Sequence, residues 1–279
     1  MMFGCAKNDN NGLDNSEPVA FSVKIVKPEA LTKAPGNFTE ADGEGNILVC
    51  NNVTITLKDA DGGTIQTAQV GDIDNLPDDT YTFWNVQKPT SVEVSINGGV
   101  ESYADLTSVS GEPASMPAFG KTTSITYEGL KAYDETLAGN DAGEAGMSYS
   151  NYVATVNVRI PVARLEMGGI QHVVGEGGSL FNNLTFLSVE VRNATVAGEY
   201  SEGNSVFEAV GENVQNLTDE VNENFLTEGV VFPTTGCYVY NFFVSSDKQP
   251  EVAFNFSTLN GEETVKLYAV VDHFVDGDG

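Results

Sequence analysis

The sequence lacks most of the residues on which catalytic and metal sites depend. Its 279 residues include two histidines, His172 and His273, which lie far apart in the chain. Neither has a second histidine or cysteine at the spacing of zinc ligands. No Gly-x-Ser-x-Gly elbow is present, and the glycine-rich stretch 175–178 has no following Lys-Ser/Thr to close a phosphate loop. We therefore expect no enzyme, no metal site and no cofactor.

Basic residues are also scarce. The chain has 13 Lys and Arg against 40 Asp and Glu, which gives a formal net charge of -27. A surface of that sign repels nucleic-acid phosphates and anionic lipid headgroups. The arginines are Arg159, Arg164 and Arg192, too few for a basic groove. Nucleic-acid binding is therefore excluded.

Cysteine and long apolar runs are equally limited. Cys5 lies in a polar N-terminal stretch, whereas Cys50 and Cys237 each border an apolar run. We interpret Cys50 and Cys237 as ordinary buried cysteines, with a bridge between them as the alternative. No segment reaches the ~18 apolar residues that a membrane-spanning helix needs.

Acidic turns are the remaining places where the sequence offers metal ligands. None of them carries the full spacing of a calcium loop with its closing glutamate. We therefore interpret them as solvated turn carboxylates. The turns contain Asp59 and Asp61, then Asp134, Asp141 and Glu144, and finally Asp276 and Asp278.

Alternation of apolar and polar residues is what the sequence has in abundance. In the first such run Val19, Phe21, Val23 and Ile25 share one face of a predicted strand. About a dozen further strands follow, with possible short helices at 103–109 and 214–225. The pattern predicts an all-β protein with minor α content, built as two β-sandwiches in tandem.

A cluster of Asp, Glu, Asn and Gly at 131–150 is typical of a linker or a long surface loop. It divides the chain into an N-terminal tether, 1–17, a first sandwich, 18–146, and a second sandwich, 147–279. We expect the second sandwich to be incomplete at its C-terminus.

The first 36 residues contain a possible lipidation site, a polar tether, and a strand followed by a loop with a basic residue. Met2-Phe3-Gly4-Cys5 looks like the cut end of a lipoprotein signal, so we expect the sequence to begin inside such a signal. The alternative is a start codon beside a chance Gly-Cys. A polar tether and the first strand follow. Then comes a loop in which Lys33 precedes Ala34. The order favours a secreted protein whose first strand is removed.

Several motifs resemble, in their order and spacing, those of the Bacteroidales fimbrillin (FimA-type) pilins. Each is weak alone, but together they span most of the chain. They are Phe21 to Val26 with Lys33-Ala34-Pro35-Gly36, Val53 to Thr64, Tyr81 to Gln87 with Ser91 to Gly98, Val158 to Leu165, and Tyr238 to Phe243 with Tyr268 to Val271.

This resemblance implies transthyretin-like sandwiches and a defined life cycle. The precursor is exported and lipidated, with palmitate, at Cys5 in the outer membrane. A trypsin-like surface protease then cuts between Lys33 and Ala34, which releases the strand of Val19, Phe21, Val23 and Ile25. Subunits polymerise by donor-strand exchange into an extracellular fimbrium with tip and anchor proteins. The fimbrium contributes to biofilms and to adhesion on host or bacterial receptors.

Two departures from the family pattern keep alternatives open. The cleavage residue is lysine where the family usually has arginine, and Lys33 as an ordinary loop lysine is the alternative. The family also continues with terminal strands beyond the end of this sequence. A fimbrial tip or anchor subunit is therefore a rival. A second rival is a surface lipoprotein that binds glycan through Tyr81, Phe83 and Trp84.

Overall fold

The computed structural model describes residues 17–27, 50, 52–106, 115–173, 181, 183–211, 213–243, 250–260 and 263–271. Cys5, Lys33, Ala34, His273 and the Asp276/Asp278 pair lie outside these ranges. Within them the chain is almost entirely β-structure, which confirms the all-β prediction. The minor α content is not found in this part of the chain, where the helical turns are two short 3₁₀ segments. These are η1 (Ile73–Asn75) and η2 (Pro77–Asp79).

The helix expected at 214–225 is wrong, because these residues form strand β15 (Val214–Asn224). Leu217 and Val221 both pack against the apolar core of their unit. Their four-residue spacing suits one face of a helix and equally one face of a strand, so periodicity alone did not separate the two. The other expected helix begins in β6 (Ser102–Tyr103), and its end lies outside the described residues.

The chain divides into two compact units. Described residues of 17–26, 50–94 and 121–157 belong to the first, and those of 95–120 and 158–271 belong to the second. This division differs from the predicted boundary between 146 and 147. Strand β9 (Ser148–Asn157) pairs with β8 (Ile125–Ala132) from Ser148 to Ala154, so the acidic segment between them is a loop inside one unit.

One four-stranded sheet lies wholly within the first unit, and a second four-stranded sheet takes most of its residues from that unit. The alternation predicted for its strands is confirmed in β2 and β5, where every second residue from Val53 and from Val92 is fully buried. One sheet has the order β4 (Thr80–Val86), β1 (Val19–Val26), β9, β8, and the other has the order β3 (Thr64–Val70), β2 (Val53–Lys58), β5 (Ser91–Ile96), β7 (Ala118–Thr122).

The second unit is built from one four-stranded sheet and three smaller ones. The four-stranded sheet has the order β15, β12 (Thr185–Thr195), β18 (Glu251–Asn260), β19 (Glu263–Val271). The β18–β19 ladder runs antiparallel from the pair Val252 and Val271 to the pair Asn260 and Glu263. One smaller sheet has three strands in the order β14 (Val206–Ala209), β13 (Gly198–Ser201), β6. The other two are pairs. One joins β10 (Ala163–Met167) to β17 (Tyr238–Phe242), and the other joins β11 (Ile170–Gln171) to β16 (Val231–Phe232).

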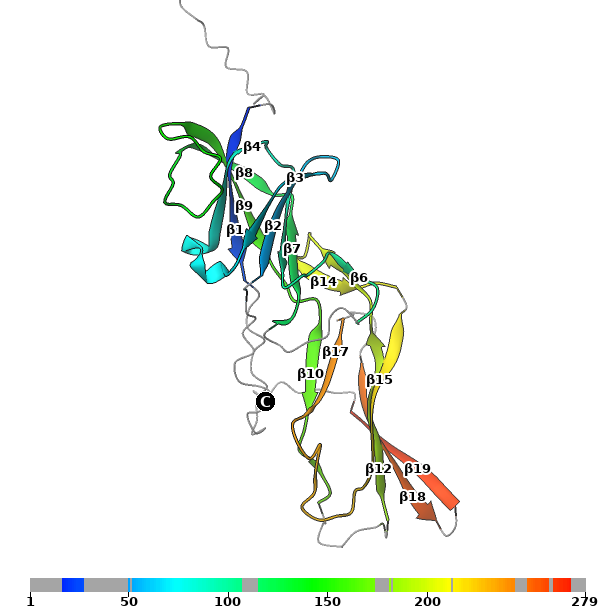
Figure 1. Cartoon of the computed structure of the whole chain (residues 1–279). Coiled ribbons are helices and arrows are strands. Elements are labelled where there is room, and N and C mark those ends of the chain that lie inside the picture. The colour runs from blue at the N-terminus through cyan, green and yellow to red at the C-terminus, as the bar shows by residue number, and fades with distance from the viewer. Residues whose placement is uncertain are drawn as a thin grey trace, which may run out of the picture. The chain divides into compact units, whose positions relative to one another are not determined.

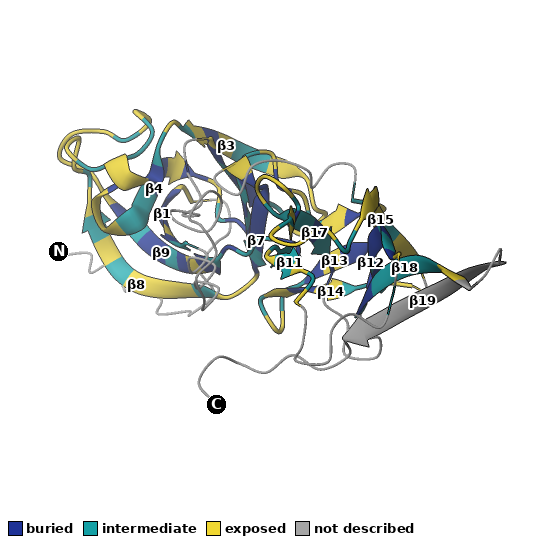
Figure 2. Ribbon diagram, turned by 90° about the horizontal axis from the view of Figure 1, so that it is seen from below, coloured by how far each residue is buried: buried dark blue, intermediate teal, exposed yellow. Residues whose placement is uncertain are grey.

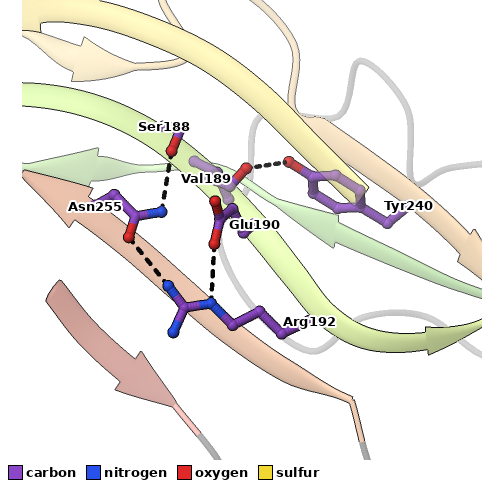
Figure 3. A network of polar contacts seen from close by, with 6 residues as sticks. All are labelled: Ser188, Val189, Glu190, Arg192, Tyr240 and Asn255. Atoms are coloured by element: carbon purple, nitrogen blue, oxygen red, sulfur yellow. Dashed lines mark hydrogen bonds and ion pairs between the residues drawn. The ribbon is translucent and has the colours of Figure 1, made fainter. Parts of the chain in front are cut away.

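A polar network crosses from β12 to β18 in the second unit (Figure 3). The Asn255 amide donates to the Ser188 hydroxyl over 3.0 Å and accepts from the Arg192 guanidinium over 3.1 Å. Arg192 also donates to the Glu190 carboxylate, 2.9 Å away. One of the three arginines is therefore committed to holding two strands together.

Tyr240, at the centre of the same unit, is 4% exposed and packs with Phe186 and Phe232. Its hydroxyl donates to the backbone carbonyl of Val189 over 3.2 Å. Burial, and next the neighbouring Asp219 carboxylate, raise the pKa of this phenol well above its ordinary value. The phenol therefore stays protonated and donating through the physiological range.

Two cysteines, Cys50 and Cys237, lie within the described residues. Cys50 is buried and Cys237 half-buried, and both are thiols rather than halves of a disulfide, so the alternative bridge is wrong. In the part of the chain that the structure describes, no helix is long and apolar enough to cross a bilayer.

Candidate functional site: the slot that holds the first strand

Strand β1 is a central strand of its sheet (Figure 1). It pairs antiparallel with β4 on one side, where Phe21 lies opposite Phe83 and Ser22 opposite Thr82. On the other side it pairs in parallel with β9 along all eight of its residues. We call the space between β4 and β9 the β1 slot. A strand leaving it would expose unpaired backbone groups on two neighbours at once.

The inner face of β1 consists of the four apolar residues that the sequence singles out. Val19 is 4% exposed, Phe21 and Val23 are 0% exposed, and Ile25 is 1% exposed. Figure 2 shows the edge strand β8 largely exposed, whereas its neighbour β9 carries buried, dark blue positions. At about 1.5–3 kcal/mol for each such side chain, burial of this face is a large part of what fixes β1 in place.

A bulge in β4 allows both faces of β1 to be covered. Between the pairs Val19–Val86 and Phe21–Phe83 the register shifts by one residue. The extra residue falls at Asn85, whose φ of 55° is one that asparagine tolerates. Val86 and Phe83 are therefore both buried opposite the inner face, whereas Trp84 shares a side with Thr82 and the outer face of β1.

The outer face of β1 is buried as well, which alternation alone did not predict. Ala20 is 0% exposed and Ser22 is 3% exposed. Ala20 forms an apolar cluster with Trp84 and Tyr149. Two residues of the loop between β8 and β9, Tyr133 and Leu137, pack against that cluster. The signal in the sequence was the pair of small residues, Ala and Ser, at these outward positions.

Residues 133–147, the covering segment, lie over this outer face and are hydrogen-bonded to β4. The Thr82 N–H donates to the Ala138 carbonyl over 2.9 Å, and the Asn140 N–H donates to the Thr82 carbonyl over 3.3 Å. The Asn140 side chain accepts from the Trp84 N–H and donates to the Trp84 carbonyl. Gly139 is required here, because a Cβ would stand 2.3 Å from the Thr82 oxygen.

A polar pocket surrounds Ser22 beneath the covering segment. The Ser22 hydroxyl lies 3.1 Å from that of Thr82 and donates to the Asn151 side-chain oxygen over 3.4 Å. The Lys131 ammonium donates to Ser22 over 3.0 Å and to Thr82 over 3.3 Å. It also lies 5.5 Å from the centre of the Trp84 ring.

Burial lowers the pKa of Lys131 from its ordinary value, although the carboxylates of Glu128 and Asp134 act in the opposite direction. An ammonium group removed from water in this way depends on the hydroxyl oxygens that accept its protons. The loss of one of those oxygens would leave the cation poorly satisfied.

The aromatic side chains proposed for glycan binding are not available on the surface. Phe83 is 0% exposed and Trp84 is 1% exposed. Tyr81 is half-buried, with the centre of its ring 4.9 Å from that of Phe83 in an edge-to-face contact. A glycan-binding face made of these three residues is therefore wrong.

The acidic turns bind their own backbone. The Asp59 carboxylate accepts from the N–H groups of Asp61 and Gly63, and that of Asp134 accepts from the N–H and hydroxyl of Thr136. Hydrogen bonding to Thr136 lowers the pKa of Asp134. Among the residues that the structure describes, no three His, Cys, Asp or Glu side chains gather as metal ligands do.

Comparisons with known proteins yield matches among solved structures. No family model and no curated protein sequence matches the chain. A protein proposed to act in cell adhesion from Bacteroides eggerthii is 14% identical, with a TM-score of 0.49, and the match covers 91% of this chain and 79% of that chain. A second, from Parabacteroides distasonis, is 12% identical at a TM-score of 0.46, with the same coverage. A proposed adhesin from Bacteroides ovatus is 10% identical at 0.41, covering 91% and 78%.

Proposed function

We propose that the protein is a structural subunit of a cell-surface fimbrium, without catalytic activity, in which β1 is removed and replaced by a strand of another subunit. The observation that carries the proposal is the position of β1, a central strand with both edges paired and both faces packed. Once vacated, such a slot exposes apolar surface and unpaired backbone groups. A strand from a second molecule restores both.

We further propose that proteolytic cleavage of a membrane-attached precursor opens the β1 slot. The precursor is a lipoprotein attached to the outer membrane at Cys5, and a trypsin-like surface protease cuts between Lys33 and Ala34. The sequence between β1 and β2 contains this lysine, so one cut separates β1 from the rest of its unit. Released subunits join other fimbrial subunits, with tip and anchor proteins at the ends. The assembled fibre meets host or bacterial surface receptors.

Limited digestion with trypsin, followed by mass spectrometry and size-exclusion chromatography, tests this function. The wild-type chain is expected to lose residues 1–33 and then to form oligomers. A Lys33→Gln variant should stay intact and monomeric under the same conditions, and Lys33→Arg should behave like wild type. A cleaved chain that stays monomeric at high concentration, or oligomers that form equally well without cleavage, would contradict the proposal.

A further inference from the structure

We propose that the β1 slot selects its incoming strand on both faces, which deepens the proposed function and rests on it. On the inner side the partner strand has large apolar residues at the positions of Val19, Phe21, Val23 and Ile25. On the outer side it has a small residue at the position of Ala20 and a hydroxyl at the position of Ser22. The partner is therefore a segment of alternating large apolar and small residues, rather than any amphipathic strand.

Size is limited at Ala20 by a rigid arrangement of rings. The Trp84 ring meets Tyr133 edge-to-face at 5.2 Å between ring centres and lies 6.0 Å from that of Tyr149. Ala20 is 0% exposed against this cluster. The covering segment cannot simply lift away, because four hydrogen bonds join Ala138 and Asn140 to β4. A larger side chain would have to displace packed rings.

The side chain that can occupy the position of Ser22 is limited by three polar groups around its hydroxyl oxygen. They belong to Lys131, Asn151 and Thr82. The Lys131 ammonium donates to this hydroxyl, and the hydroxyl in turn donates to Asn151. An apolar side chain here would deprive a partly desolvated cation of an acceptor, and Asn151 of a donor. The pocket therefore distinguishes a hydroxyl from a methyl group of similar size.

The third outward residue of β1 supplies an internal control. Lys24 lies on the same face as Ala20 and Ser22, opposite Thr80 and Thr155, yet it is exposed. The restriction therefore covers the first two of the four outward positions, which are Ala20, Ser22, Lys24 and Val26. The same substitution should be harmful at Ser22 and nearly neutral at Lys24.

The test uses the full chain nicked after Lys33 and fluorescent peptides with the sequence of residues 17–27. Uptake is measured by anisotropy for the native peptide and for peptides with Ala20→Leu, Ser22→Leu, Ser22→Ala or Lys24→Leu. We expect at least about tenfold weaker binding for both leucine changes at Ala20 and Ser22, and about threefold to tenfold weaker binding for Ser22→Ala. Lys24→Leu should stay within about threefold of the native peptide.

A Lys131→Met variant of the nicked chain should bind the native peptide and the Ser22→Ala peptide equally well. The ammonium group that donates to the Ser22 hydroxyl is absent from this variant. Equal binding of all peptides would overturn the inference while leaving strand exchange intact. Uptake of no peptide would contradict strand exchange itself.

In that case the same changes in the intact chain still test the slot. Ser22→Leu should lower the unfolding temperature and Lys24→Leu should not, and equal effects of the two would overturn the selectivity.

Discussion

At the scale of single residues, the two units use polar side chains in the same way. Lys131 in one unit and Arg192 in the other each join hydroxyl or amide groups of neighbouring strands. These contacts connect residues far apart in the sequence, such as Ser22 and Asn151, which is why the sequence did not reveal them. What could be predicted at this scale was the inner row of β1, because its alternation is local.

Replacement of Tyr240 by phenylalanine tests the buried phenol. Its folded-state pKa lies above the unfolded value of 10, so the folded protein binds the proton more tightly. The stability this contributes is present below about pH 10 and is lost as pH rises further. Urea unfolding between about pH 9 and pH 11 should show a steeper loss for wild type than for Tyr240→Phe.

The control for this change is Tyr127→Phe, which removes one phenol from an exposed position. At neutral pH Tyr240→Phe should be less stable than wild type by about 0.5–1.5 kcal/mol, because the hydrogen bond to Val189 is lost. A difference from wild type that stays constant across the alkaline range would contradict the assignment.

At the scale of elements, strands were predicted most accurately where a strand buries one face and exposes the other. β2 and β5 follow their alternation residue by residue. Prediction failed for β15, an edge strand whose apolar spacing also suits a helix. Composition predicted a linker or a long surface loop at 131–150, and residues 133–147 form a loop whose close packing was not predicted. Their packing depends on Tyr133 and Leu137 meeting Ala20 and Trp84, which no local pattern encodes.

The covering segment can be tested as an element through Gly139→Ala. The added methyl group would meet the Thr82 carbonyl, so we expect a loss of about 1–3 kcal/mol in the free energy of unfolding. Gly71→Ala is the matched control in the same unit, because a Cβ there would meet nothing within 4 Å. Urea titration measures both variants. Equal stability of the two would show that the covering segment is not held against β4.

At the scale of the whole molecule, charge is the dominant property. A net charge of -27 on 279 residues makes two copies repel each other over distances that salt shortens. Composition predicts that nucleic acid is not a partner, and alternation correctly predicted the all-β class. The exact division into units was not predictable, because the pairing of β9 with β1 joins residues 131 positions apart, as in Val19 with Ser150 or Phe21 with Tyr152.

Assembly of the cleaved chain should therefore accelerate with salt. Between about 20 mM and about 300 mM sodium chloride, screening weakens the repulsion between subunits, so light scattering should rise faster at the higher concentration. The uncleaved chain at the same two salt concentrations is the control. Slower assembly at high salt would indicate that attraction between opposite charges, rather than apolar burial, joins the subunits.

The parallel ladder between β1 and β9 has a consequence for any fibre built by strand replacement. A strand that pairs in parallel with β9 and antiparallel with β4 can run in one direction only. Where each subunit takes a strand from one neighbour and gives its own to another, the joint is head-to-tail, so successive subunits point the same way. Such a fibre has polarity. One end of the fibre presents an open slot and the other an unused strand. Subunit addition and its termination therefore involve different contacts at the two ends.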